Sequence, residues 1–188
     1  MTDFERGDPA RDGVLGVGAA AGATDGEEEI SGARRAVDEP DWATNHSFRK
    51  RCLLQLQEAL EAEKEEIRAE LVAEVGTPNL LTYGPQLDAP LADGLRWPAQ
   101  RIDTFEWERD LPEGNAFGIR SWRKTYREAV GVVAAITPWN YPFEITINKL
   151  GQALATGNTV ILKGAPDTPW TTARFGRLIA EKTDIPAG

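Results

Sequence analysis

Residues 130–163 read VGVVAAITPWNYPFEITINKLGQALATGNTVILK, and this stretch decides the fold class of the chain. The apolar run from residue 131 to residue 137 has no polar alternation, which is typical of a strand buried on both faces of a sheet. Residues 138–140 break this run, and residues 143–156 then carry apolar side chains at helical spacing. A second apolar run over residues 159–162 completes a strand, a helix and a strand.

A further helix is predicted downstream, over residues 170–182, with Phe175 and Leu178 facing inward. The order strand, helix, strand, helix favours an α/β fold in which Val132 and Val160 lie in parallel strands joined by a right-handed crossover. Two parallel strands leave a long sheet edge unpaired. We therefore expect this βαβα unit to be an incomplete part of a larger domain.

Upstream of this unit the sequence predicts a long helical segment. Apolar residues recur at three-, four- and seven-residue steps from Phe48 to Leu71, with Ser47 as the N-cap and Gly76 as the stop. Because about thirty residues is long for one globular helix, we expect a break near residues 61–63.

Two other segments are predicted to have little regular structure. Residues 13–26 are mostly Gly and Ala and bury too little apolar area to offset their ordering entropy, so residues 1–26 are expected to be loosely ordered. Residues 77–118 hold five prolines and are predicted as loops around short helices near residues 91–107.

Composition excludes several classes of function. The 188 residues include 30 Asp and Glu against 21 Lys and Arg, a net charge of -9 that repels a nucleic acid duplex, so no nucleic acid partner is expected. Cys52 and His46 are the sole residues of their types, which excludes an internal disulfide framework and a His-rich metal site. No apolar run approaches the ~18 residues of a membrane span and no secretory signal begins the chain, so we expect a cytoplasmic protein without a membrane partner.

Polar side chains follow both predicted strands. Thr137-Pro-Trp-Asn140 follows the first strand and Lys163 ends the second, and the carboxyl ends of neighbouring parallel strands face one crevice. Asn140 offers a neutral amide that can stabilise a developing oxyanion, and Lys163 offers a cation for a phosphate or a ribose hydroxyl. Neither a Gly-x-Gly-x-x-Gly fingerprint nor a Gly-Lys-Ser/Thr loop follows either strand. Ordinary polar caps at two strand ends are the alternative interpretation.

Three motifs occur in order in this part of the chain: Pro138-Trp-Asn140, then Lys149-Leu-Gly-x-Ala-Leu-Ala-x-Gly-Asn158, then Lys163. In this order and spacing the chain resembles the NAD(P)-dependent aldehyde dehydrogenase superfamily, over roughly residues 33–188. The resemblance implies a fragment that corresponds to roughly the N-terminal two-fifths of a full-length member. It also implies an oxidoreductase that converts a small-molecule aldehyde to a carboxylic acid through a cysteine thiohemiacetal, with NAD or NADP as the coenzyme.

Roles for single residues follow from the resemblance. Asn140 matches the family's oxyanion-binding asparagine, and Lys149 matches a lysine beside the active site that is sometimes drawn into a proton relay. Ile136, Pro138 and Trp139 match the turn that lines the coenzyme. A plain core position for Trp139 and a surface helix position for Lys149 are the alternatives.

Two further positions concern the coenzyme's adenosine ribose. Lys163 matches the lysine that lies at this ribose. Pro166 stands where many NAD-preferring members carry a glutamate that accepts a hydrogen bond from the 2'-hydroxyl, and Asp167 follows one residue later. Because the acid at 166 is missing, the sequence gives no reason to reject a 2'-phosphate, and NAD and NADP both stay open.

Composition, periodicity and the resemblance together divide the chain into four parts: a loosely ordered tail over 1–26, a helical N-terminal part over 27–117, an oligomerisation-type hairpin arm over 118–129 and a partial coenzyme-binding domain over 130–188. The resemblance is compatible with a homo-oligomer. The charged segment from Gly118 to Tyr126 is expected to form an exposed antiparallel hairpin arm that lacks its partner strand in an isolated chain.

Several parts of the family's active site are not in the sequence. Its nucleophilic cysteine, general-base glutamate and Gly-Ser-Thr-x-x-Gly loop lie further along than residue 188, so we expect no turnover from this chain alone. Cys52 lies on a predicted helix and is expected to pack between helices. A truncated, catalytically inactive protein that at most assembles with full-length subunits is the main alternative, and a free-standing nucleotide-binding module is the third.

Overall fold

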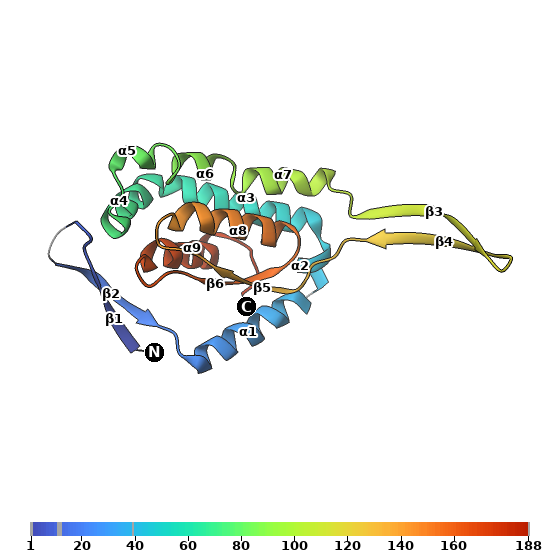
Figure 1. Ribbon diagram of the computed structural model, residues 1–188, viewed down its shortest axis with the longest axis horizontal. Coiled ribbons are helices and arrows are strands. Elements are labelled where there is room, and N and C mark those ends of the chain that lie inside the picture. Colours follow the sequence, from blue (N-terminus) through green and yellow to red (C-terminus); the bar gives the residue numbers. More distant parts are fainter. Residues whose placement is uncertain (1, 11–12, 39, 188) are drawn as a thin grey trace.

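The predicted parallel strands are present and lie between layers of helices (Figure 1). The computed structural model describes residues 2–10, 13–38 and 40–187. The elements of the βαβα unit are β5 (Val132–Ile136), α8 (Pro142–Ala155), β6 (Thr159–Lys163) and α9 (Pro169–Lys182). β5 and β6 pair in parallel, with Val133 opposite Val160. The α/β fold class with an incomplete sheet is therefore confirmed.

These two strands have less cover than the sequence predicts. In Figure 1 the pair runs between α8 and α1 (Ala23–Asp38), and both helices contact it. Ala135 is the one buried side chain of β5, whereas Ala134 and Ile136 are exposed. In a sheet of two strands each strand has an open edge, and the helices leave part of each strand uncovered. The prediction of a first strand buried on both faces is therefore wrong.

The N-terminal helices confirm the predicted break and stop. In chain order they are α2 (Pro40–Thr44), α3 (His46–Ala62), α4 (Lys64–Val75), α5 (Asn79–Thr82), α6 (Asp88–Asp93) and α7 (Arg96–Thr104). Glu63 separates α3 from α4, and Gly76 ends α4 in the left-handed region with a φ of 72°. The N-cap is Asn45 and not Ser47, because α3 begins at His46 and Asn45 Oδ1 accepts from the backbone N of Phe48 at 3.0 Å.

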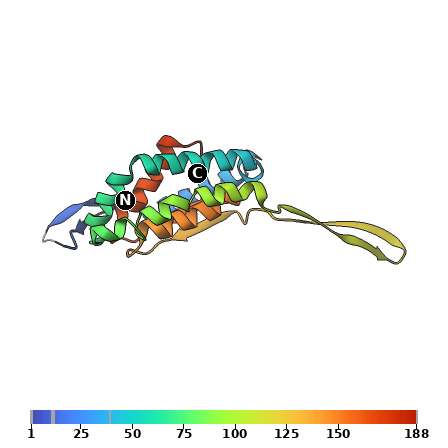
Figure 2. The ribbon, with the colours of Figure 1, turned by 90° about the horizontal axis from the view of Figure 1, so that it is seen from above.

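One hydrophobic core joins these helices to the βαβα unit. Seen from above (Figure 2), α3 and α7 lie side by side over α8. The fully buried core side chains include Leu53, Leu56, Leu60, Ile67, Phe143, Ile147 and Phe175. The rings of Phe143 and Phe175 lie 5.3 Å apart, centroid to centroid. Among the helices of the described residues, none is long and apolar enough to cross a membrane.

An exposed hairpin arm projects from the helical body (Figures 1 and 2). It consists of β3 (Glu108–Ala116) and β4 (Ile119–Tyr126), which pair antiparallel, so an exposed antiparallel arm is confirmed. The arm begins near residue 108 and not at 118, and β4 has its partner strand in its own chain. Pro112 and Gly114 are uncommon inside strands, so the sequence predicts a loop where β3 lies. The register of the β3–β4 pair shifts between Leu111 and Gly114.

The structure also differs from the expected loose order of residues 1–26, of which residues 1, 11 and 12 lie outside the described part. β1 (Thr2–Gly7) and β2 (Val14–Ala20) form an antiparallel hairpin, and α1 starts at Ala23. Glycine at positions 16 and 18 lets the backbone approach two rings, since a Cβ there would lie 2.8 Å from an atom of the Trp170 ring and of the Phe4 ring, respectively. Close contact of the β2 backbone with these two rings thus helps to order a segment whose small side chains bury little apolar area.

A buried carboxylate connects α4 to the start of α9. Glu74, near the end of α4, is 1 % exposed and accepts from the backbone N atoms of Trp170 and Thr171, each at 3.0 Å, and from the Thr171 hydroxyl. These N–H groups are among the donors that the first turn of a helix leaves unpaired. Burial is the main cause that raises the pKa of the Glu74 carboxyl above its usual range, against the opposing effect of these hydrogen bonds.

Glu74→Gln is expected to gain stability relative to the wild type as the pH rises from 4 to 7. A carboxyl whose pKa is raised in the folded state holds its proton more tightly there than in the unfolded chain, so its contribution to the free energy of unfolding falls as the pH rises through that window. Glutamine keeps an oxygen acceptor and does not titrate. Urea unfolding at several pH values measures the difference, with the exposed Glu28→Gln expected to follow the wild type. A difference for Glu74→Gln that does not change with pH would contradict this expectation.

Candidate functional site

The carboxyl ends of β5 and β6 bring two predicted groups to one edge of the sheet. Ile136 lies opposite Lys163 in the parallel register, and the backbone N of Thr137 donates to the carbonyl O of Lys163 at 3.0 Å. The turn at residues 138–140 therefore begins directly beside the end of β6. The predicted juxtaposition of this turn with Lys163 is confirmed.

The side chains at this edge are open to solvent. Ile136 and Trp139 are 63 % and 57 % exposed, and Lys163 is exposed as well. No hydrogen bond or ion pair within the described residues involves the Lys163 ammonium. The edge thus combines an apolar surface with an uncompensated cation, a combination that suits a ligand with both a flat apolar part and hydroxyl or phosphate groups.

Asn140 occupies the last position of the turn before α8. Its side chain is exposed, while its backbone carbonyl accepts a hydrogen bond from Gln86 Nε2 at 3.0 Å. Tyr141 caps α8 and Pro142 is its first residue. Sequence reasoning missed Gln86, which lies in the stretch Gly84-Pro85-Gln86 between two short helices and carries no motif.

Lys149 lies away from this turn. It is seven residues beyond Pro142, about 10 Å along the axis of α8, on the exposed side of the helix. Within the described residues no hydrogen bond or ion pair joins it to Asn140. The structure therefore places Lys149 on the same helix as the turn and does not bring the two side chains together.

The loop after β6 carries Pro166 and Asp167, both exposed. Arg6 of the N-terminal hairpin donates to the carbonyl O of Asp167 and, from Nη2, to the carbonyl O of Glu74 at 2.9 Å. A cavity of about 250 Å³ lies here, and its lining residues are Arg6, Pro9, Glu74, Val75, Trp139, Asp167 and Thr168. The hairpin thus holds the backbone of the loop close to the Trp139 side of the edge.

Cys52 is not a nucleophile of this edge. It is fully buried among the core side chains of α3, as predicted for a cysteine that packs between helices. Burial raises the pKa of its thiol to about 11, which leaves almost no thiolate at neutral pH.

The sequence of this chain is similar to that of a known protein family. A sequence model described as the aldehyde dehydrogenase family matches residues 1–188. The chain belongs to the aldehyde dehydrogenase family. The match includes the turn, the crossover helix and the arm.

Curated relatives of this aldehyde dehydrogenase chain are considerably longer. The NADP/NAD-dependent aldehyde dehydrogenase PuuC of Escherichia coli is 32% identical over 187 residues, which are 98% of this chain and 36% of that protein. The aminoacetaldehyde dehydrogenase of Pseudomonas aeruginosa is 34% identical over 187 residues, with the same coverage of 98% and 36%. The chain therefore spans little more than a third of the length of these aldehyde dehydrogenases.

Solved aldehyde dehydrogenase structures agree with the fold. The aldehyde dehydrogenase KauB from Pseudomonas aeruginosa has a TM-score of 0.89 and 31% identity, with 99% of this chain and 36% of that chain covered. An indole-3-acetaldehyde dehydrogenase in complex with NAD+ has a TM-score of 0.86 and 30% identity, with 98% and 36% covered. The two-stranded sheet of this chain thus corresponds to one portion of a larger aldehyde dehydrogenase chain.

Proposed function

We propose that this chain supplies the oxyanion donor and one flank of the coenzyme site of an NAD(P)-dependent aldehyde dehydrogenase, which oxidises a small-molecule aldehyde to a carboxylic acid. The proposal rests mainly on the parallel register of β5 and β6, which puts the turn at Asn140 and the cation of Lys163 at one sheet edge. Ligands of open α/β sheets bind at such edges. The family to which the chain belongs supports the reaction class.

The proposed role of Asn140 is electrostatic. When a thiolate attacks an aldehyde, negative charge develops on the carbonyl oxygen, and a fixed N–H donor stabilises that charge. The Asn140 carboxamide is neutral at every physiological pH, so it needs no adjustment of a pKa to donate. The attacking thiol is not Cys52, which is buried. It belongs, in this proposal, to a part of the enzyme that the 188 residues do not include.

The residues at the edge fit one flank of a dinucleotide. Ile136, Pro138 and Trp139 offer an exposed apolar surface, and the Lys163 ammonium can donate to ribose hydroxyls. Pro166 presents no carboxylate toward a 2'-phosphate, so NAD and NADP both fit in this proposal. NAD or NADP, when bound, supplies the hydride acceptor. We assign residues 130–188 to the coenzyme-binding part on these grounds.

The role proposed for Lys149 has less structural support than the role proposed for Asn140. Its ammonium is exposed on α8 and has no hydrogen bond or ion pair within the described residues. We propose that it contributes to proton movement beside the active site, at a distance from Asn140. A surface lysine without a catalytic role is the alternative.

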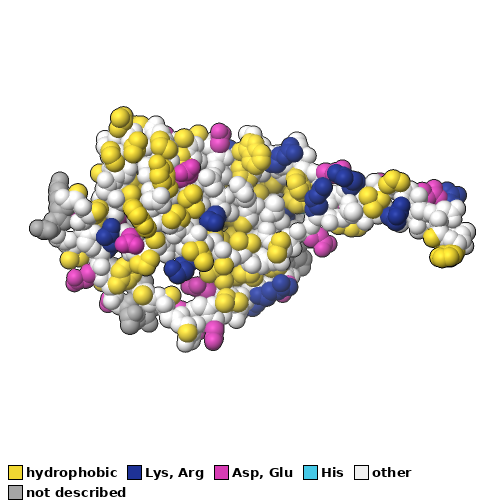
Figure 3. Space-filling model, viewed as in Figure 1, with side chains coloured by type: hydrophobic (Ala, Val, Ile, Leu, Met, Phe, Trp, Pro, Cys, Tyr) yellow, Lys and Arg dark blue, Asp and Glu magenta, His cyan; other side chains and the backbone are white. Residues whose placement is uncertain are grey.

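The proposal extends to assembly as a homo-oligomer in the cytoplasm, where an unpaired cysteine such as Cys52 stays reduced. The arm of β3 and β4 carries exposed Ile119, Trp122 and Tyr126 on β4, and Phe117 at its tip. In Figure 3 basic and acidic side chains follow the arm outward to a hydrophobic tip. Exposed aromatic side chains on a protruding strand pair suit contact with a second copy of the chain.

Turnover is expected only when this chain is joined to the region that follows the matched part of the Pseudomonas aeruginosa aminoacetaldehyde dehydrogenase. The 188 residues provide a donor and one coenzyme flank, and covalent aldehyde oxidation also needs a nucleophile and a base. The measurement is formation of reduced coenzyme from NAD and NADP with several aldehydes, for the chain alone and for the joined protein.

Cys52→Ser is the control and is expected to change neither result. Turnover by the chain alone that disappears in Cys52→Ser would show that the nucleophile is Cys52. A joined protein that folds and assembles without turnover would favour the alternative of a catalytically inactive protein that only associates with full-length subunits.

A further inference from the structure

We infer that Gln86 is a positioning residue for Asn140, an inference that rests on the proposed role of Asn140. Gln86 lies between α5 and α6, 54 residues before Asn140 in the sequence, and is 3 % exposed. Its Nε2 donates to the Asn140 carbonyl O at 3.0 Å. Since a carbonyl can only accept, the amide group of Gln86 has one orientation in this contact.

The turn at Asn140 has few other constraints. On one side the Thr137 N–H is bonded to the Lys163 carbonyl, and on the other side the Tyr141 carbonyl accepts from the backbone N of Ile145 at 3.1 Å. Within the described residues the bond from Gln86 is the single hydrogen bond to the backbone of residues 138–140. The peptide that follows Asn140 is thus held by Gln86, and its orientation helps to set the direction in which the Asn140 side chain leaves the backbone.

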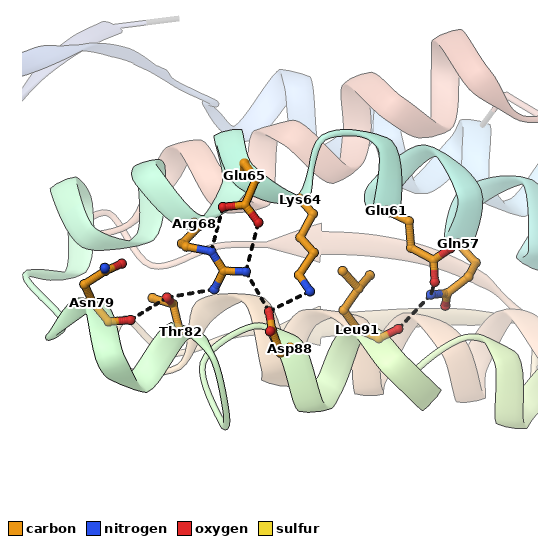
Figure 4. Close-up of polar contacts among 9 residues, drawn as sticks. All are labelled: Gln57, Glu61, Lys64, Glu65, Arg68, Asn79, Thr82, Asp88 and Leu91. Carbon is orange, nitrogen blue, oxygen red and sulfur yellow. Dashed lines mark hydrogen bonds and ion pairs between the residues drawn. The ribbon is translucent and has the colours of Figure 1, made fainter.

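Gln86 lies in a segment that is bonded to α4 on both sides. Arg68 of α4 donates to Thr82 Oγ1 at 2.9 Å and to Asp88 Oδ1 at 2.8 Å (Figure 4), and these two residues flank Gln86 in the sequence. Lys64 makes a second ion pair with Asp88 at 3.0 Å. Because α4 fixes both ends of the segment, Gln86 is a rigid support for the turn, as a positioning residue must be.

The chain offers a matched control in Gln57. Gln57 is also fully buried, and its Nε2 donates to the Leu91 carbonyl O at 2.7 Å (Figure 4). The Oε1 atom of each glutamine is buried without a partner in the described residues. Gln57→Met and Gln86→Met therefore each remove a buried hydrogen bond from a glutamine Nε2 to a backbone carbonyl. Gln57→Met also removes the bond from Nε2 to Glu61 Oε1 at 2.8 Å, and only Gln86→Met removes a contact to Asn140.

The first test measures turnover in the joined enzyme described above. Gln86→Met is expected to lower kcat by about 10- to 100-fold, with the KM for coenzyme changed by less than about threefold. Gln57→Met is expected to leave kcat and both KM values within about threefold of the wild type. Gln86→Glu is expected to recover rate relative to Gln86→Met as the pH falls, because a protonated carboxyl can donate to the Asn140 carbonyl and a carboxylate cannot.

A double-variant cycle shows whether Gln86 acts through Asn140. The pair Gln86→Met and Asn140→Ala together should be no slower than Asn140→Ala alone, since a positioned group that is absent cannot be misplaced. Effects that multiply, or an equal loss in Gln57→Met, would overturn the inference. If Asn140→Ala is as active as the wild type, the proposed role of Asn140 fails instead.

The second test needs no turnover and uses the 188-residue chain. The side-chain amide signals of Asn140 in a 1H–15N NMR spectrum are expected to move in Gln86→Met and to stay in place in Gln57→Met. Asn140 signals that are unchanged in Gln86→Met, in a chain that is folded, would overturn the inference whatever the joined enzyme does.

Discussion

Replacing Asn140 by alanine is expected to lower kcat of the joined enzyme by about 10²- to 10³-fold. The loss of one preorganised oxyanion donor removes stabilisation that exists mainly in the transition state, so kcat should fall far more than coenzyme affinity. Asn140→Asp is expected to be at least as slow, because a carboxylate cannot donate and repels the developing charge. Steady-state rates over a range of aldehyde and coenzyme concentrations separate kcat from KM.

Asn79→Ala is the control for this substitution. Asn79 has an exposed side chain at the start of α5, far in sequence from the turn, and its loss should leave kcat unchanged. An Asn140→Ala enzyme with a raised KM for coenzyme and a normal kcat would place Asn140 in coenzyme binding and not at the oxyanion.

Arg49→Ala is expected to cost about 3 kcal/mol or more of the free energy of unfolding. The Arg49 guanidinium is fully buried on α3 and donates to the carbonyl oxygens of Trp42 at 2.9 Å, Ala43 at 2.8 Å and Ala155 at 3.2 Å. These carbonyls lie in the last turns of α2 and α8, so one side chain satisfies acceptors at the ends of two helices. Burial lowers the pKa of Arg49 to about 10, and it stays cationic at neutral pH.

Urea unfolding of the chain measures this loss. Arg49→Lys keeps a cation, but its single ammonium cannot reproduce the fork of the guanidinium, so an intermediate loss is expected. The exposed Arg35→Ala on α1 should change the free energy of unfolding by less than about 0.5 kcal/mol. A loss in Arg49→Ala no larger than that of Arg35→Ala would show that water replaces Arg49 at these carbonyls.

The parts of the fold that could be predicted from the sequence have local signals. Two short apolar runs separated by a helical pattern suffice for β5, α8 and β6, and a left-handed glycine marks the end of α4 at Gly76. The β1–β2 hairpin has a weaker signal, because β2 is mostly Gly and Ala after its first residues and the short, charged β1 has one large apolar side chain, Phe4. Its stability comes from fit against Phe4 and Trp170, and Trp170 is far away in the sequence.

The candidate site likewise has contacts that the sequence predicts and contacts that it does not. Asn140 and Lys163 could be placed together from the sequence because parallel strands always end at the same edge, so topology alone brings their positions side by side. The contact of Gln86 could not be predicted, because its partner is a backbone carbonyl, which every residue has. Arg6 could not either, since its acceptors are the carbonyls of Glu74 and Asp167. Contacts from side chain to backbone over long separations leave no pattern in the amino-acid types.

The hairpin of β1 and β2 also bears on the order in which the protein folds during synthesis. Arg6 and Asp167 are 161 positions apart, so Asp167 leaves the ribosome long after Arg6. At about 5–20 residues per second the hairpin waits on the order of ten seconds for this loop. Contacts of such high contact order form late. The contact between Arg6 and the loop beside Lys163 is therefore made only after residue 167 has emerged, and until then the β1–β2 hairpin lacks this partner.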